Sequence, residues 1–217
     1  MMFGDRREAG ERLAQALSRF ADRDPVVLAI PRGGVVVGDV VARALEAELD
    51  VVIPRKVGAP GNPELGLGAV APGVRVLDER LIRDLHVSQD YLEKEIEAQE
   101  REIERRARRY RNGREPAKVE GRTAIVVDDG VATGGTAAAA AKWAKKAGAA
   151  RVVLAVPVAP PQAAGLLAKD ADEVVILATP EPFYAVGQWY EFFDQVSDEE
   201  VVSILEAARK GTAEGRG

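Results

Sequence analysis

Cysteine is absent from this chain of 217 residues, and histidine occurs once, at His86. Without cysteine the chain has no disulfide framework and no cysteine-ligated metal site. A single histidine excludes a zinc site built from several histidines and argues against a catalytic triad that needs histidine as its base. Because His86 lies in a polar stretch, we expect it at the surface and not in a catalytic role.

Long apolar runs and an excess of positive charge are also missing. No run is long and apolar enough to span a membrane, and the first ten residues, MMFGDRREAG, lack the apolar core of a signal peptide. The formal net charge of -5 gives no basic footprint for nucleic acid. Hydrophobic residues make up 47% of the chain, which is ample for a core. We expect a single cytoplasmic domain, residues 1–217, that binds neither nucleic acid nor membranes.

Apolar runs of strand type alternate with helix-forming stretches along the chain. We expect strands at 26–30, 51–55, 123–127, 151–156 and 173–177, and helices at 6–20, 36–48, 136–147 and 162–169. The strands are nearly continuous in valine, isoleucine and leucine, which indicates burial on both faces. This pattern predicts an α/β fold with a parallel-stranded sheet flanked by helices. Ligands of such folds bind beyond the carboxyl ends of the strands.

The most informative segment is residues 125–136, IVVDDGVATGGT. Its apolar run ends in Asp128 and Asp129, and a glycine-rich loop then opens an alanine-rich helix. Unpaired backbone N–H groups at a helix start bind phosphate well. Two carboxylates beside such a loop would repel a bare phosphate, but they suit a phosphorylated sugar whose hydroxyls donate to them. The segment therefore predicts a phosphoribosyl site.

Other phosphate-binding loops fit this segment less well. A Walker-type loop needs lysine before its final hydroxyl residue, whereas Gly135 precedes Thr136 here. A dinucleotide loop needs the spacing G-x-G-x-x-G, which the glycines at 130, 134 and 135 do not have. The remaining alternative is a strand, a turn and a capped helix with incidental acids.

VVDDGVATGGT resembles the phosphoribosyl-diphosphate (PRPP) binding motif of the type I phosphoribosyltransferases. It is most similar to the adenine and orotate branches, which lack an acid inside the loop, whereas hypoxanthine-guanine enzymes usually carry Asp where this chain has Ala132. The resemblance implies that Asp128 and Asp129 hold the ribose hydroxyls. It also implies that the 5′-phosphate lies in a cradle formed by Ala132, Thr133, Gly134, Gly135 and Thr136.

A second segment, Pro31-Arg32-Gly33-Gly34, follows the strand predicted at 26–30. A glycine pair lets backbone N–H groups approach an anion closely, and Arg32 offers a fixed charge to pyrophosphate oxygens. A plain turn between a strand and a helix is the alternative. The segment is similar to the pyrophosphate loop of the same family, and it precedes the acidic motif as in that family.

A third segment, VVIPRK, ends in Arg55 and Lys56. In the adenine and orotate enzymes a similar pair ends the second strand and helps to hold pyrophosphate; a solvated charge pair is the alternative. Residues 58–73 are rich in glycine and proline, so we expect a loop there, near the place where the family has a mobile catalytic loop. Glu64, within this stretch, is interpreted as a turn residue.

Residues 89–112 carry a narrow apolar stripe on a highly charged helix, with acids first and arginines last. We expect this helix, within an insertion at 78–115, to lie across the parallel sheet or to form a dimer contact. Its apolar stripe is too short to predict a coiled coil. Downstream, Ser197 and Glu200 predict a capping box for a last helix that extends through Ala208.

Most aromatic residues gather in residues 179–196, a segment that is similar to the hood of hypoxanthine-guanine enzymes. That resemblance implies that Tyr184 or Phe183 stacks on a base, that Val186 offers backbone contacts, and that Glu191 faces a metal and pyrophosphate. The alternative is a core cluster, which we favour for Phe192 and Phe193.

Together the motifs predict transfer of the 5-phosphoribosyl group from PRPP to a nitrogen of a nucleobase. Mg²⁺, held by Asp128, Asp129 and Glu191, would neutralise the leaving diphosphate with Arg32 and Lys56. No general base is evident, so the nucleophile arrives deprotonated or Glu64, Glu191 or water serves. The acceptor stays open. Relatives commonly pair across their sheets, which implies a homodimer.

Two other functions are considered for the same site. A PRPP-binding regulator without catalysis is the chief alternative, although Arg32 and the Arg55-Lys56 pair are retained here. A sugar-phosphate hydrolase or kinase would need a placed base or a second nucleotide site, and the sequence offers neither.

Overall fold

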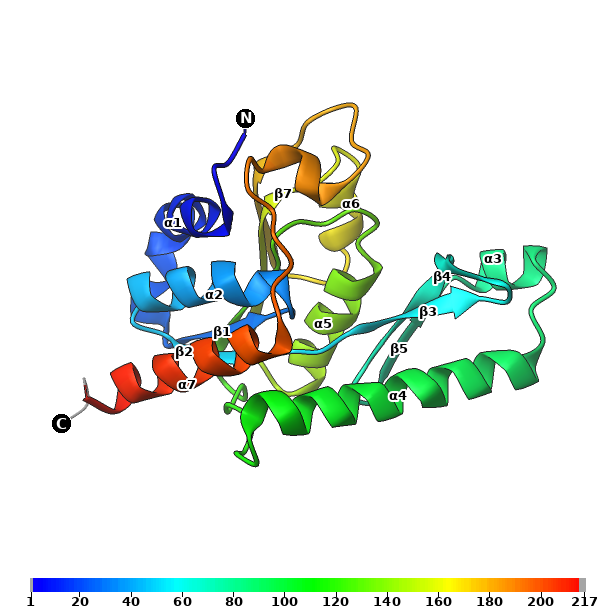
Figure 1. Ribbon diagram of the computed structural model, residues 1–217, viewed down its shortest axis with the longest axis horizontal. Helices are drawn as coiled ribbons and strands as arrows, with labels where there is room; N and C mark the ends of the chain where they lie inside the picture. Colours follow the sequence, from blue (N-terminus) through cyan, green and yellow to red (C-terminus); the bar gives the residue numbers. More distant parts are fainter. Residues whose placement is uncertain (1, 215–217) are drawn as a thin grey trace.

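The computed structural model describes residues 2–214, with side chains described through Lys210. Five parallel strands form the main sheet in the order β2-β1-β6-β7-β8 (Figure 1). They are β1 (Pro25–Ala29), β2 (Glu48–Val51), β6 (Thr123–Val127), β7 (Arg151–Val158) and β8 (Glu173–Ala178). The prediction of an α/β fold with a parallel sheet flanked by helices is confirmed.

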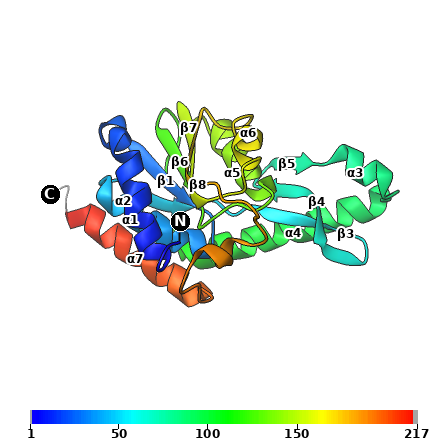
Figure 2. The same ribbon diagram turned by 90° about the horizontal axis from the view of Figure 1, so that it is seen from above.

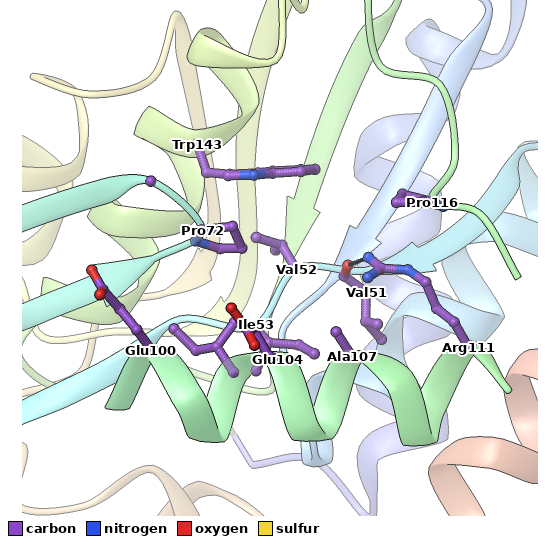
Figure 3. Close-up of a pocket in the computed structure, with 12 residues that line it drawn as sticks. Val51, Val52, Ile53, Pro72, Glu100, Glu104, Ala107, Arg111, Pro116 and Trp143 are labelled. Atoms are coloured by element: carbon purple, nitrogen blue, oxygen red, sulfur yellow. Dashed lines mark hydrogen bonds between the residues drawn. The ribbon is translucent and has the colours of Figure 1, made fainter. Parts of the chain in front are cut away.

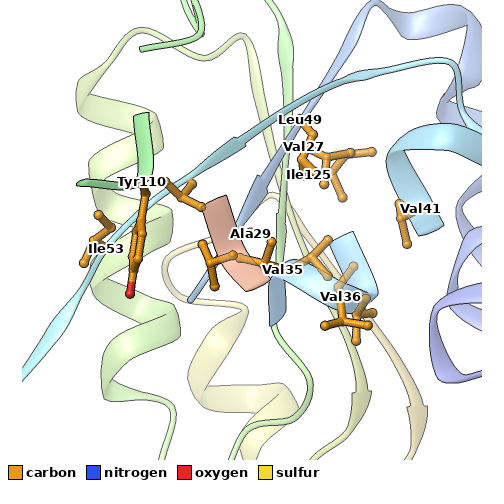
Figure 4. Close-up of a cluster of buried hydrophobic side chains, with 14 of the residues drawn as sticks. Val27, Ala29, Val35, Val36, Val41, Leu49, Ile53, Tyr110 and Ile125 are labelled. Carbon is orange, nitrogen blue, oxygen red and sulfur yellow. The ribbon is translucent and has the colours of Figure 1, made fainter. Parts of the chain in front are cut away.

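Helices cover both faces of this sheet because its strands are apolar on both sides. Val27 and Ala29 of β1 belong to one core cluster, part of which Figure 4 shows, and Val26 and Leu28 of the same strand belong to another. This alternation follows from the two-residue repeat of a strand. The first cluster includes residues of α1 (Arg6–Leu17), α2 (Gly33–Ala44) and α7 (Asp198–Glu214), and the second includes residues of α5 (Gly135–Lys146) and α6 (Ala163–Leu167).

A second sheet occupies the stretch that the sequence analysis predicts as a loop. Its three antiparallel strands, in the order β3-β4-β5, extend to one side of the main sheet (Figure 1). They are β3 (Arg55–Ala59), β4 (Asn62–Ala71) and β5 (Val74–Leu77). The loop prediction for residues 58–73 is therefore wrong. Glycine is needed at three places here: Gly61 and Gly73 turn the chain with φ of 71° and 67°, and Gly68 has φ of 149°.

The charged helix predicted at 89–112 is α4 (Gln89–Arg111), and it follows the short helix α3 (Glu79–Asp84). Its stripe residues Leu92, Ile96, Ile103 and Tyr110 are buried. The helix packs on β3 and β4 and, near its carboxyl end, on α7 (Figures 1 and 2). The helix was expected across the parallel sheet; it lies across a sheet, but on the second, antiparallel one. The assignment of residues 78–115 as an insertion stays a prediction.

Several predicted boundaries move. The strand expected at 51–55 is wrong, because β2 ends at Val51 and the chain then runs to β3 in the other sheet. The helix expected at 36–48 begins earlier, at Gly33, and ends at Ala44. Short 3-10 helices lie at Ser18–Arg23 and Val186–Trp189. The predicted cap of α7 is present in part, since the Glu200 N–H donates to Ser197 Oγ over 3.1 Å.

Within residues 2–214, no helix combines the length and apolar character needed to cross a membrane.

Candidate functional site

The acid pair lies directly beyond the carboxyl end of β6, in the middle of the main sheet. Asp128 follows Val127, and the Asp129 N–H donates to Asp128 Oδ1 over 2.8 Å. Burial, and then the neighbouring charge of Asp129, raise the pKa of the Asp128 carboxyl well above its ordinary value.

The glycine pair of the PRGG segment lies against these acids. A β-carbon on Gly33 would stand 1.9 Å from Asp129 Oδ2, and one on Gly34 would stand 2.9 Å from the Asp128 Cα. Only residues without a side chain allow α2 to begin this close to β6. The peptide bond between Pro31 and Arg32 is cis. The structure thus brings the two segments together, as the sequence analysis predicts.

Arg32 is exposed beside this junction, at the residue that precedes α2. Its Nη1 stands 4.0 Å from Asp198 Oδ1 at the start of α7. Asp198 also accepts a hydrogen bond from the Tyr110 hydroxyl over 2.6 Å and pairs with Arg109 Nη1 at 2.8 Å. The Tyr110 hydrogen bond and the nearby arginines lower the pKa of the Asp198 carboxyl. The guanidinium of Arg32 remains 43% exposed and is available to an anion.

The loop after the acids opens α5 in the manner expected for a phosphate cradle. Ala132 and Thr133 are exposed, and Gly134 adopts φ of 86° as the residue that precedes the helix. No side chain caps this start in the part of the chain that the structure describes. The first N–H groups of α5, from Gly135 and Thr136, therefore remain for a ligand.

The aromatic segment near the carboxyl terminus lies over the loop through Val186. A β-carbon on Gly130 would stand 2.4 Å from Val186 Cγ1. Phe183 stacks on Trp189 with 6.2 Å between ring centroids, whereas Tyr184 is 83% exposed. Tyr184 is therefore free to meet a planar ligand.

The core cluster favoured for Phe192 and Phe193 forms around only one of them. Phe193 packs in an aromatic cluster with Phe3 and Tyr190, but Phe192 is 63% exposed. The expectation that Phe192 is a core residue is therefore wrong. The reason is the backbone: the Phe192 N–H donates to Gly4 O, which fixes this residue on the edge that pairs with the amino terminus.

Glu191 lies on the same edge, where its N–H donates to Phe3 O. Its side chain is exposed. Among residues 2–214, no group of three or more acidic or histidine side chains could hold a metal ion. The structure therefore does not join Glu191 to Asp128 and Asp129 in the three-carboxylate metal site that the sequence analysis expects.

Two residues that contact the acid pair were not predicted from the sequence. Arg6 Nε donates to Asp129 Oδ2 over 2.7 Å, and the Tyr190 hydroxyl donates to Asp129 O over 2.5 Å. Burial raises the pKa of the Tyr190 hydroxyl, which keeps it a neutral donor. Both lie far from Asp129 in sequence, so no local pattern could have identified them.

A family model described as "Phosphoribosyl transferase domain" matches residues 5–200, a range that includes all of these side chains except Phe3. The chain belongs to this phosphoribosyl transferase family. The family predicted from the acidic motif is thereby confirmed.

Relatives of this phosphoribosyl transferase domain agree with that assignment. "Putative phosphoribosyl transferase MT0597" of Mycobacterium tuberculosis (strain CDC 1551 / Oshkosh) is 47% identical over 214 residues, which are 98% of this chain and 48% of that protein. The chain thus spans about half the length of the curated relatives it matches. TT1426 from Thermus thermophilus shares 51% identity with a TM-score of 0.80, covering 94% of this chain and 98% of that one. A hypothetical protein from Neisseria gonorrhoeae with bound ppGpp shares the fold, with 17% identity, a TM-score of 0.51, and coverage of 96% and 99%.

The third predicted segment of this phosphoribosyl transferase domain lies elsewhere. Arg55 Nε donates to Gln99 Oε1 of α4 over 2.9 Å, and burial lowers the pKa of this guanidinium. Lys56 Nζ stands 3.1 Å from the exposed Glu64 carboxylate across the β3–β4 hairpin. Glu64 lies in β4, so its interpretation as a turn residue is wrong. Across residues 2–214, neither Arg55 nor Lys56 has a hydrogen bond or ion pair with the acid pair; both begin the second sheet instead.

A separate cavity of about 610 Å³ lies between α4, the chain after β2 and the β4–β5 turn (Figure 3). Trp143 of α5 lies across one side, with Glu104 and Ala107 of α4 opposite (Figure 3). None of its lining residues is a predicted site residue. The candidate site of the phosphoribosyl transferase domain is the open edge around the acid pair, and not this cavity.

Proposed function

We propose that this protein transfers the 5-phosphoribosyl group of PRPP to a nitrogen of a nucleobase and releases diphosphate. The observation that carries the proposal is the contact of the Gly33-Gly34 backbone with Asp128 and Asp129, beside the uncapped start of α5. This one edge offers acceptors for sugar hydroxyls and two groups of backbone donors for phosphates. A sugar that carries phosphate groups at both ends needs that combination.

Each part of PRPP has a matching group at this edge. Asp128 and Asp129 accept hydrogen bonds from the ribose hydroxyls. The loop from Ala132 to Thr136 holds the 5′-phosphate through its N–H groups. Arg32, exposed at the start of α2, faces the diphosphate. Lys56 is paired with Glu64 on the second sheet, so the structure supports its role in holding diphosphate less directly than that of Arg32.

Magnesium fits this arrangement as an ion shared with the substrate. The acid pair supplies two carboxylates, and Mg²⁺ is commonly held by one or two carboxylates together with substrate phosphates. When bound, the ion would supply neutralisation of the diphosphate charge. We leave Glu191 out of this donor set, because the described residues hold no cluster of three acids.

The chemistry then follows from charge. The bond from the anomeric carbon to the diphosphate oxygen breaks, and its electron pair leaves with the diphosphate. The ribose ring becomes positive, and the acid pair beside it stabilises that charge. The lone pair of a base nitrogen forms the new bond, with the base stacked on the exposed Tyr184 ring. We assign the nitrogen proton to water.

A PRPP-binding protein without transferase activity is the second candidate. It is favoured by the position of Arg55 and Lys56, which the second sheet holds away from the acid pair. The two candidates share the PRPP site and differ in the chemistry that follows binding.

The test is to incubate the purified protein with PRPP, Mg²⁺ and a panel of free purine and pyrimidine bases, and to measure diphosphate release. PRPP binding is measured in parallel by calorimetry. Release that depends on one base establishes the transferase and identifies its acceptor. Binding without release with any base supports the second candidate, and absence of PRPP binding overturns both. The matched control is Asp90→Asn, an exposed α4 acid paired with Lys94, which is expected to leave binding unchanged.

A further inference from the structure

Arg6 lies where the acid pair, the PRGG segment and the aromatic segment meet. Its Nε stands 2.7 Å from Asp129 Oδ2, and a β-carbon on Gly33 would stand 2.7 Å from the same nitrogen. Its Nη1 donates to the Asp194 carbonyl over 2.7 Å. The side chains of Arg6 and Asp129 are only 11% and 15% exposed. An ion pair at the protein surface would not be surrounded by other groups on several sides in this way.

The guanidinium is held in place by a ring as well as by polar groups. Its Cζ stands 3.8 Å from the centroid of the Phe193 ring, a distance at which a cation is attracted to the ring face. A planar guanidinium that stacks on a ring and donates from two edges has one orientation. Arg6 therefore fixes Asp129 through Oδ2, and Oδ1 keeps a defined direction.

Further hydrogen bonds join the amino-terminal residues to the aromatic segment beside the acid pair. The Phe3 N–H donates to Trp189 O, and the Phe192 N–H donates to Gly4 O. Tyr190 adds its hydroxyl bond to Asp129 O. The amino-terminal residues and the aromatic segment thus form one unit, which is attached to Asp129 through its side chain and its carbonyl.

We propose that Arg6 is a positioning residue, which orients Asp129 toward the ribose and connects it to the aromatic segment where the base is expected. This inference rests on the proposed function, because it assigns the ribose to Asp129. It explains why a largely enclosed cation lies beside the acids although the diphosphate is expected at Arg32. Arg6 acts through Asp129 and touches no reacting atom.

The proposal separates ligands that contain ribose from those that do not. Loss of Arg6 leaves Asp129 without its charge-assisted partner, so PRPP and ribose 5-phosphate bind more weakly. Inorganic diphosphate, which needs Arg32 and backbone donors, binds as before. If Arg6 had a purely structural role, its loss would lower the affinity for all three ligands together.

The experiment is calorimetric titration of wild-type protein, Arg6→Gln and Arg6→Lys with PRPP, ribose 5-phosphate and diphosphate, each in the presence of Mg²⁺. Arg6→Gln is expected to lower the affinity for both ribose ligands by about tenfold to a hundredfold, which is the effect of losing a hydrogen bond to a charged group. Arg6→Lys restores charge but not the planar fork, so it recovers part of this loss. The control is Arg101→Gln, which removes an exposed arginine of α4 that pairs with Glu97 on the same helix.

The outcomes separate this proposal from the proposed function. Wild-type protein that binds no PRPP overturns the proposed function and this inference with it. Wild-type protein that binds PRPP, with Arg6→Gln binding it equally well, overturns the role of Arg6 alone. If Arg6→Gln fails to fold, Arg6→Lys decides: an equal loss for diphosphate and for the ribose ligands refutes the proposal.

Discussion

Gly33 lies so close to Asp129 that the space between them has no room for a methyl group. A β-carbon at Gly33 would stand 1.9 Å from Asp129 Oδ2 and 2.7 Å from the carboxyl carbon. Because Arg6 holds the Asp129 carboxylate, that side chain could move away from a new β-carbon only by losing its ion pair. The start of α2 and the end of β6 are therefore matched at this glycine, as they are at Gly34.

We expect Gly33→Ala to displace the Asp129 carboxylate and to weaken PRPP binding by more than about tenfold, the effect of losing one charge-assisted contact. Calorimetry measures the affinity, and circular dichroism checks that the helices persist. Gly165→Ala is the control, since a β-carbon at that helical glycine meets nothing within 4 Å. It should leave binding intact. Equal affinity of Gly33→Ala and wild-type protein would show that the glycine contact is not needed.

Asp129→Asn should keep the fold and reduce PRPP affinity by about tenfold to a hundredfold, which corresponds to roughly 1.5–3 kcal/mol. The amide has nearly the volume of the carboxylate but lacks the charge that attracts ribose hydroxyls and Arg6. Titration with PRPP measures the loss, and urea unfolding confirms that the variant is folded. Unchanged affinity in a folded variant would remove the sugar-binding role from Asp129.

The ionisation of Asp198 should make the free energy of unfolding depend on pH in the acid range. Its folded pKa is lowered by Tyr110 and the nearby arginines, so its contribution is present above its unfolded pKa, about 3.9, and is lost as the pH falls through the folded value. At neutral pH, Asp198→Asn should lower the free energy of unfolding by about 1.5–3 kcal/mol. Urea unfolding between pH 7 and pH 3 should show the difference from wild-type protein shrinking toward acid. A constant difference would exclude a contribution from this ionisation.

Ile96 tests whether α4 holds the second sheet in place. Its side chain is 1% exposed and belongs to the core cluster that includes Val57 and Leu67 of that sheet. We expect Ile96→Ala to lower the free energy of unfolding by about 2–5 kcal/mol, the range for truncating a buried aliphatic side chain. Leu85→Ala, at a residue 44% exposed, is the control and should have little effect. Similar unfolding free energies for the two variants would mean that α4 is not part of the cooperative core.

The acid pair and the PRGG segment could be predicted because each is encoded in consecutive residues. A buried strand ending in Asp128 and Asp129, and a strand followed by two glycines, need no knowledge of distant residues. The parallel arrangement then brings both to one edge, since parallel strands end on the same side. The contact of Gly33 with Asp129 needs β1 and β6 to be neighbours as well, which the strand order of the folded sheet provides.

The second sheet was missed because its turns resemble a loop in composition. Pro60-Gly61 and Pro72-Gly73 each form a tight turn with the glycine at positive φ. Between them β4 is a strand of ten residues. Two proline-glycine pairs separated by a strand length were the signal, and glycine content alone obscured it.

Sequence alone determined the family, the parallel sheet and the position of the acid pair and the PRGG segment at its edge, because these depend on local runs of residues and their order. Tertiary structure decided which side chains join that edge. It brought in Arg6, which is 123 residues from Asp129 in the chain, together with Tyr190. It held Lys56 on the second sheet and left Glu191 on an exposed outer edge. Such contacts depend on how the amino terminus, the hairpin and the carboxyl-terminal segment pack, and no short stretch of sequence encodes that packing.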